Sequence, residues 1–266
     1  MSGSRLMPTP YTKPALTIAE QIDLLRTRGM VLDQPAAMKA LEQLGYYRLS
    51  GYWYPFRKFD AAGVRLDEFR LGTTLDAVIS QYEFDRALRL ELLNAIERIE
   101  VALRTAVTYH FAHHAGPQGY ADPAHFRTGF AHADWLSRAD DEVSRSREKF
   151  IEHFAAKYEG FPRVPIWMLT EVVSIGSLSK LLTGLATPIQ SGIARQYKVH
   201  QVVLTSWVHA LTVVRNHCAH HARLWNREFG VKPKRPERDL RWAALDNGRL
   251  FAVLLVLRHM LRAHAD

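Results

Sequence analysis

Apolar residues recur at three- and four-residue spacing along most of the chain, which is the periodicity of amphipathic helices. The longest such stretch runs from about 75 to 114, and a Thr at 73 or 74 stands before it as a helix cap. Its apolar positions define one buried face: Val78, Tyr82, Leu88, Leu92, Ala95, Ile99, Ala102 and Ala106. No run of 18 or more apolar residues occurs, so the pattern favours packed helices over a membrane-spanning one.

Two shorter helices are expected before this stretch, each delimited by capping signals. Thr17 and Glu20 have the spacing of a capping box and open a helix over 18–28. A second helix over 34–44 begins with a Gln-Pro pair and is closed by Gly45.

The rest of the chain also reads as helix after helix. A loop rich in Gly, Pro and His is expected over 116–130. Further helices are expected over 135–158, 166–173, 178–185, 200–226 and 240–264. We therefore predict an all-α fold with an N-terminal helical and aromatic extension (1–72) packed on a helical core (73–266), with no clear linker between them.

The densest aromatic segment, 46–56, is expected to begin a short irregular or hairpin element over 46–70. Two interpretations of its rings remain open. They either pack a corner of the core, or they form an exposed face beside Arg48 and Arg57 on which bases of single-stranded RNA stack.

The net charge of +8 indicates a polyanionic partner such as RNA, although a basic surface without a partner explains the charge equally well. The single cysteine, Cys218, excludes an internal disulfide and fits a reducing compartment. Residues 1–10 lack the apolar core of a secretion signal, so a cytoplasmic location is expected.

A polar cluster interrupts the apolar stripe near the end of the 200–226 helix. Asn216 and His220 are four residues apart and share a helix face, whereas Arg215 lies roughly 140° around the helix from His220. Long side chains at these positions can still converge on one ligand. An imidazole can move the protons of RNA cleavage, a guanidinium can hold the scissile phosphate, and an amide can orient either.

Three other interpretations of this cluster stay open. His217 and His221 are four residues apart and, with Cys218, have the spacing of metal ligands, but no third His or Glu completes a known pattern. Cys218 beside a histidine also allows a nucleophile, for which no third, orienting group is evident. The simplest interpretation is a polar helix end whose His and Arg side chains meet the helix dipole.

The sequence R-N-H-C-A-H at 215–220 resembles the R-x4-6-H signature of HEPN-domain ribonucleases. The chain also resembles the abortive-infection (Abi) family of the AbiD/AbiF type. The similar blocks occur in the family's order over about residues 12–230: 16–22, 44–52, 82–89, 97–105, 165–179 and 215–227.

This resemblance implies a HEPN-type helical bundle that dimerises and cuts RNA during phage defence. The composite site takes one motif from each protomer, needs no metal or other cofactor and leaves a 2′,3′-cyclic phosphate. Arg215, Asn216 and His220 take the catalytic roles, and His221 gives an alternative register. The expected partners are RNA, a second copy of the chain and, as an open alternative, a neutralising antitoxin, with no membrane. The competing function is a non-cleaving or conditionally activated protein that holds a structured non-coding RNA.

A second match to the signature runs from Arg104 to His110 but lacks the asparagine after the arginine. We expect Glu97, Glu100 and Arg104 to pair within or between helices, and the alternative is that they orient His220. The basic residues expected to contact RNA are Arg48, Arg57, Arg223, Arg227, Lys232, Lys234 and Arg235.

Overall fold

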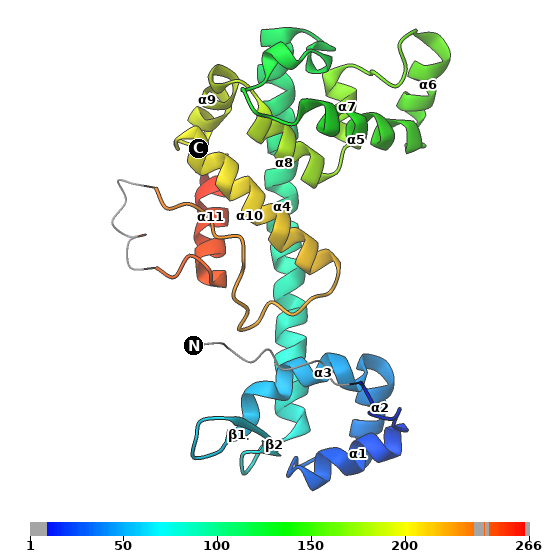
Figure 1. Ribbon diagram of the computed structural model, residues 1–266, viewed down its shortest axis with the longest axis vertical. Coiled ribbons are helices and arrows are strands. Elements are labelled where there is room, and N and C mark those ends of the chain that lie inside the picture. The colour runs from blue at the N-terminus through cyan, green and yellow to red at the C-terminus, as the bar shows by residue number, and fades with distance from the viewer. Residues whose placement is uncertain (1–9, 237–241, 243–244, 264–266) are drawn as a thin grey trace. The chain divides into compact units, whose positions relative to one another are not determined.

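The computed structural model describes residues 10–236, 242 and 245–263. This part of the chain holds eleven α-helices and a single two-stranded sheet, which confirms the all-α prediction (Figure 1). It divides into two compact units, one up to Arg86 and the other from Ala87 onward, and the division lies within helix α4 (Leu75–Ala115). No described helix combines the length and the apolar character needed to cross a membrane. The expected boundary after residue 72 stays a prediction.

The first unit begins with the two helices that capping signals predict. In α1 (Ile18–Thr27), the Thr17 N–H donates to the Glu20 carboxylate at 2.7 Å, and the Glu20 N–H donates back to the Thr17 hydroxyl. This is the predicted capping box. In α2 (Gln34–Leu44), the chain leaves the helix at Gly45, whose φ of +78° suits a residue without a Cβ atom.

The aromatic segment departs from the expectation in its first half. Residues Tyr46–Trp53 form helix α3, followed by a 3-10 turn, η1 (Tyr54–Phe56), and an antiparallel hairpin of β1 (Arg57–Phe59) and β2 (Arg65–Phe69). The prediction of an irregular or hairpin element was therefore wrong for 46–53. The helix forms because the side chains at 49, 52 and 53 lie on one face and are buried, and this packing outweighs their β propensity.

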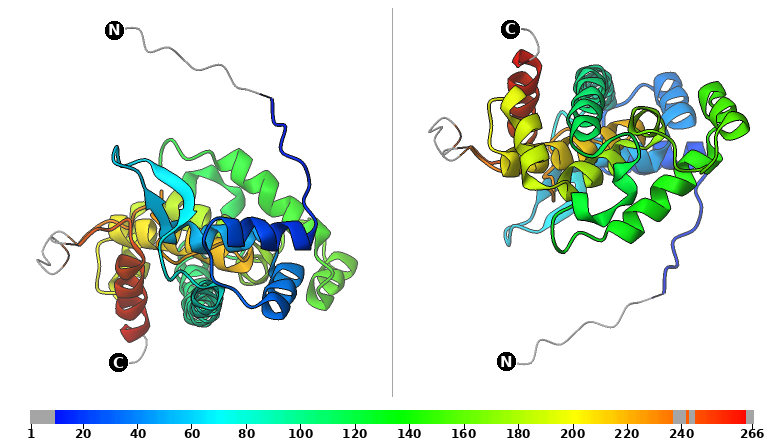
Figure 2. Two further views of the ribbon diagram at one scale, coloured as in Figure 1. Left: turned by 90° about the horizontal axis from the view of Figure 1, so that it is seen from below. Right: turned by 90° about the horizontal axis from the view of Figure 1, so that it is seen from above.

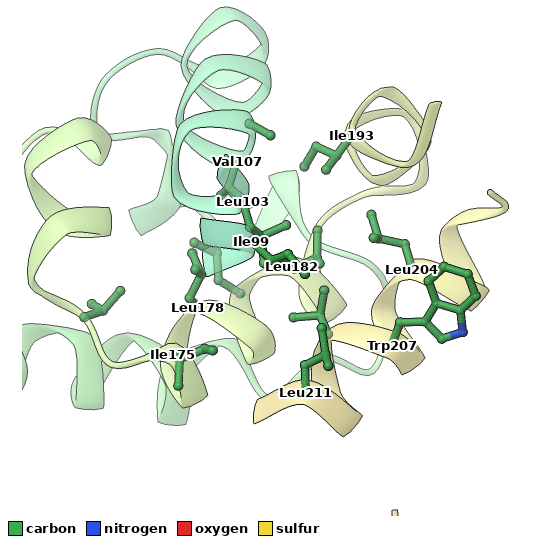
Figure 3. Packing of buried hydrophobic residues seen from close by; sticks show 14 of the residues in the cluster. Ile99, Leu103, Val107, Ile175, Leu178, Leu182, Ile193, Leu204, Trp207 and Leu211 are labelled. Atoms are coloured by element: carbon green, nitrogen blue, oxygen red, sulfur yellow. The ribbon is translucent and has the colours of Figure 1, made fainter. Parts of the chain in front are cut away.

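The second unit contains the C-terminal part of α4 and seven further helices, seen from two more directions in Figure 2. These helices are α5 (His132–Arg145), α6 (Lys149–Lys157), α7 (Ile166–Val172), α8 (Ile175–Gly184), α9 (Thr187–Gln196), α10 (Gln201–Ala219) and α11 (Leu250–Arg262). Helix α10 packs against α8, α9 and α11. Apolar side chains of α4, α8 and α10 meet in one core, in which Leu103, Leu182 and Leu211 are at most 2% exposed (Figure 3).

Besides the end of α10, three predicted helix boundaries in this unit were wrong. The single helix expected over 135–158 is two helices, because the backbone is extended at Ser146 and the Glu148 N–H bonds to the Ser146 hydroxyl at 3.3 Å instead of continuing the helix. Helix α8 starts before 178, since Ser174 caps it. The last helix, expected over 240–264, begins at Leu250, although 240, 241, 243, 244 and 264 lie outside the described residues.

Candidate functional site

Helix α10 holds the predicted polar cluster against the core of the second unit. The apolar stripe expected upstream is buried as predicted, with Trp207 and Val214 at most 1% exposed. On the last turn, Arg215 is half-buried and Asn216 is exposed, and His220 just beyond it is exposed too. One side of the helix is therefore fixed by packing, and its other side presents polar groups to solvent.

The helix ends at Ala219, so the prediction that it continues to 226 was wrong. The N–H of Ala222 donates to the His217 carbonyl at 2.8 Å, and the N–H of His221 donates to the Cys218 carbonyl at 3.0 Å. These two bonds form a Schellman motif, which normally places glycine at the left-handed position. Here His221 takes that position with φ +56°, and no Gly or Pro stands there to indicate that the helix ends.

Because the helix ends here, His220 and His221, the two candidates for the histidine of the R-x4-6-H signature, differ in backbone conformation. The N–H of His220 still bonds to the Asn216 carbonyl at 2.9 Å, so His220 keeps helical spacing from Arg215 and Asn216. His221 instead belongs to the left-handed turn. Both imidazoles are exposed, and the carbonyls of the helix end supply partial negative charge beside them.

The segment after the turn folds back toward α10 through an arginine. The Nε atom of Arg227 donates to the Arg223 carbonyl at 2.7 Å, and its Nη1 atom lies 3.5 Å from Nε2 of His217. Burial, and then the charge of Arg227, lowers the pKa of His217 below its ordinary value. A neutral His217 with its proton on Nδ1 can accept a hydrogen bond from Arg227. The sequence had indicated His217 only as a metal ligand.

The basic residues at 232–235 lie in a segment without regular secondary structure that hydrogen-bonds to α10. Trp207 donates its Nε1–H to the Lys234 carbonyl at 2.8 Å, and the Lys234 N–H donates to the Ser206 hydroxyl at 2.9 Å. Lys232 pairs with Glu228 at 3.1 Å, and the Arg235 guanidinium donates to the Leu245 carbonyl. The backbone is thus anchored, while the Lys234 side chain is exposed.

A family model for Abi-like proteins matches residues 39–226, more than half of the chain. The chain belongs to this family of Abi-like proteins. The match runs from α2 to the turn after α10 and includes all of Arg215–His220. The family's name refers to abortive infection, a form of phage defence. No curated protein and no solved structure matches the chain.

The second signature match of this Abi-like protein lies on α4. The Arg104 guanidinium pairs with Glu100 at 2.5 Å, as their four-residue spacing predicts. It also donates to the carbonyls of Thr170 and, at 3.0 Å, of Val173, which lie at the C-terminal end of α7. Glu97 is exposed. The contacts described for Glu100 and Arg104 are those expected for pairing within and between helices, and the alternative that they orient His220 stays a prediction.

The two arginines proposed for RNA contact in the first unit differ in their surroundings. Arg57 pairs with Asp67 at 2.7 Å and lies 5.7 Å from the centre of the Tyr54 ring. Arg48 is exposed on α3. Of the nearby aromatic rings, Tyr52 and Trp53 are buried and pack the core of this unit. The core interpretation is therefore confirmed for these two rings, and base stacking on the exposed rings of the segment stays a prediction.

The rival metal and nucleophile interpretations concern the residues between Asn216 and Ala222. Cys218 is 1% exposed, and burial of this kind disfavours reactivity of the thiol. In the part of the Abi-like protein that the structure describes, no three His, Cys, Asp or Glu residues are grouped so that they could hold a metal ion.

Proposed function

We propose that this Abi-like protein is a metal-independent endoribonuclease of abortive infection, with Arg215, Asn216 and His220 as its catalytic residues. The observation that supports this most directly is the end of α10. An exposed imidazole closes a helix whose preceding turn carries a half-buried guanidinium and an exposed amide. Because the opposite side of the helix is packed in the core, the backbone that carries these groups is held in place before RNA binds.

The reaction that suits these groups is internal transesterification of RNA. The 2′-oxygen attacks the neighbouring phosphorus while the bond from phosphorus to the 5′-oxygen breaks, which gives a 2′,3′-cyclic phosphate and a 5′-hydroxyl. His220 takes the proton from the 2′-hydroxyl or gives one to the leaving oxygen. Arg215 binds the phosphate and offsets the charge that develops on it, and Asn216 orients the imidazole or the phosphate.

A second copy of the chain completes this chemistry in the proposed HEPN-type arrangement. One histidine acts as the general base and the other as the general acid, so two motifs from two protomers serve one phosphate. Because each protomer supplies only one motif, with one catalytic arginine and one catalytic histidine, the protein then needs a dimer for full activity. Sedimentation of the purified protein across a range of concentrations measures the monomer–dimer equilibrium, and a protein that stays monomeric while cutting RNA contradicts the composite site.

The direct test is cleavage of end-labelled single-stranded RNA in the presence of EDTA. We expect the native chain to give products with 2′,3′-cyclic phosphate ends and His220→Ala to reduce the rate by at least about 100-fold. His209→Ala is the matched control, because His209 is an exposed histidine on the same helix outside the motif, and its loss should leave the rate unchanged.

Two results would overturn the proposal. Cleavage that survives His220→Ala removes the assigned residue, and cleavage that needs a divalent metal removes the assigned mechanism. Tight, salt-dependent RNA binding without cleavage products would instead support a protein that holds a non-coding RNA.

A further inference from the structure

The hairpin of the first unit exposes two aromatic rings with a guanidinium between them. The Arg65 guanidinium carbon lies 4.4 Å from the centre of the Tyr54 ring and 4.3 Å from that of Phe59. Tyr54 is 50% exposed and Phe59 is 56% exposed, so both rings keep much of their surface in water. We call these three side chains the Tyr54–Arg65–Phe59 stack.

The fold of the hairpin holds this stack in place. Phe59 of β1 and Arg65 of β2 are cross-strand partners, which puts their side chains on the same face of the two-stranded sheet. The Nη1 atom of Arg65 also donates to the Tyr54 carbonyl at 2.6 Å. Arg65 is therefore tied to the 3-10 turn before β1 as well as to its strand partner, and the planar groups are arranged before any ligand arrives.

The core of this unit does not require the stack. Trp53 and Phe69 pack edge to face with their ring centres 6.3 Å apart, and both are at most 2% exposed. They form a buried aromatic contact in the core of this unit. By contrast, the exposed rings at 54 and 59 lie on the solvent side. Single exposed apolar side chains are ordinary on a protein surface, but here two exposed rings contact the same guanidinium and so form one joint surface.

The charges around the stack favour an anionic ligand. Arg57 pairs with Asp67, which also pairs with Arg28, and the carboxylate of Asp60 accepts the N–H groups of the hairpin turn at 62 and 64. Arg65 has no carboxylate partner among the described residues, and the neighbouring Lys58 is exposed. The stack therefore joins planar apolar faces to positive charge.

We propose that the Tyr54–Arg65–Phe59 stack binds the bases of single-stranded RNA. Unpaired bases stack on aromatic rings and on guanidinium planes, whereas the bases of a duplex are already stacked on one another. Arg65 adds attraction for the phosphate backbone at the same place. This inference rests on the proposed function for its ligand, RNA, and it extends that function by adding a second RNA contact outside α10.

The test measures RNA affinity separately from RNA cleavage. Full-length protein carrying His220→Ala is titrated into a fluorescently labelled oligouridine of twelve nucleotides or so and into a labelled RNA duplex, with anisotropy as the readout. We expect Tyr54→Leu with Phe59→Leu to weaken single-strand binding by about tenfold or more. Leucine keeps apolar volume on the hairpin, and circular dichroism and thermal unfolding check that the variant is folded.

Two further variants separate stacking from charge and from general exposure. Arg65→Lys keeps the positive charge but lacks the planar group, so we expect it to lose part of the single-strand affinity while the slope of affinity against salt stays the same. Phe84→Leu is the matched control, because Phe84 is 58% exposed on α4 in the same unit and lies outside both the stack and the aromatic segment 46–56. The affinity of this control variant for single-stranded RNA should equal that of the unsubstituted hairpin.

The outcomes distinguish this inference from the proposed function. Unchanged single-strand affinity in the folded double variant overturns the inference, as does an equal loss of single-strand and duplex binding. If the native chain never cuts RNA but the double variant loses single-strand affinity, the inference stands and the proposed function fails. If the native chain cuts RNA and the double variant binds normally, only the inference fails.

Discussion

Nε2 of His217 lies 3.5 Å from Nη1 of Arg227, and this contact joins the last turn of α10 to the segment that follows it. The same guanidinium holds the Arg223 carbonyl through Nε. Arg227 was expected to contact RNA, but the geometry also makes it a brace for the turn that carries His220. A residue that positions the turn and a residue that binds phosphate affect kcat and KM for RNA cleavage differently.

Arg227→Lys should distinguish a brace from a phosphate contact. Lysine keeps the positive charge, but its single ammonium cannot hold the Arg223 carbonyl and the His217 ring in the same planar geometry. We expect kcat for RNA cleavage to fall by about tenfold with a smaller change in KM, because misplacing a catalytic group lowers the rate more than the binding. Steady-state kinetics measures both constants. Full activity in the lysine variant would show that only the charge matters.

The lowered pKa of His217 predicts a loss of stability in mild acid. In the unfolded chain the imidazole takes up a proton near its ordinary pKa of 6.5, whereas in the folded chain burial and Arg227 delay that protonation to lower pH. The stabilising contribution is therefore complete above pH 6.5 and declines as the pH falls from there to the folded-state pKa. Urea unfolding measures the free energy of unfolding at pH 7.5 and at pH 5.5. The decrease in this free energy between the two pH values should be smaller for His217→Gln than for the native chain. Equal differences would contradict the assignment.

His221→Gly separates the two possible registers of the signature. Glycine adopts the left-handed conformation of residue 221 without strain, so we expect the stability to stay the same or to rise by up to about 1 kcal/mol. Cleavage should be retained, because His220 keeps the helical spacing from Arg215. Unfolding curves and RNA cleavage rates measure the two effects. A well-folded glycine variant that does not cut RNA would assign the catalytic role to His221.

Local signals in the sequence predicted those helix ends that rest on side-chain caps or on glycine. Thr17 and Glu20 cap the start of α1, and Gly45 ends α2. Each of these signals lies within a few positions of the helix end that it predicts. The end of α10 could not be predicted in this way, because a histidine occupies the position where glycine is usual. Helix α3 was missed since its stability comes from burial of Tyr52 and Trp53, which is a tertiary effect.

The candidate site was predictable in part for the same reason. Arg215, Asn216 and His220 are close in sequence, so helical geometry alone relates them. The contact between His217 and Arg227 depends on how the chain turns after α10, and the pairing of Phe59 with Arg65 depends on the register of a hairpin. Neither relationship follows from a spacing rule. The sequence prediction accordingly included Tyr54 in an aromatic segment that could stack on RNA bases, but it did not include Phe59 or Arg65.

Arg104→Met tests whether the second signature match is structural or catalytic. The guanidinium is largely buried, pairs with Glu100 and donates to the carbonyls of Thr170 and Val173, so its loss leaves a carboxylate and two carbonyls without their partner. We expect the free energy of unfolding to fall by about 2–3 kcal/mol, since hydrogen bonds from a charged group each contribute more than neutral ones.

Arg98→Met, at an exposed position on the same helix, should change the stability by less than about 0.5 kcal/mol. Because the hydrogen bonds and ion pair that the structure describes for Arg104 lead to α4 and to the C-terminal end of α7, RNA cleavage well below the unfolding temperature should be the same in both variants and in the native chain. A folded Arg104→Met protein that keeps its stability but loses cleavage would instead place Arg104 in the catalytic machinery.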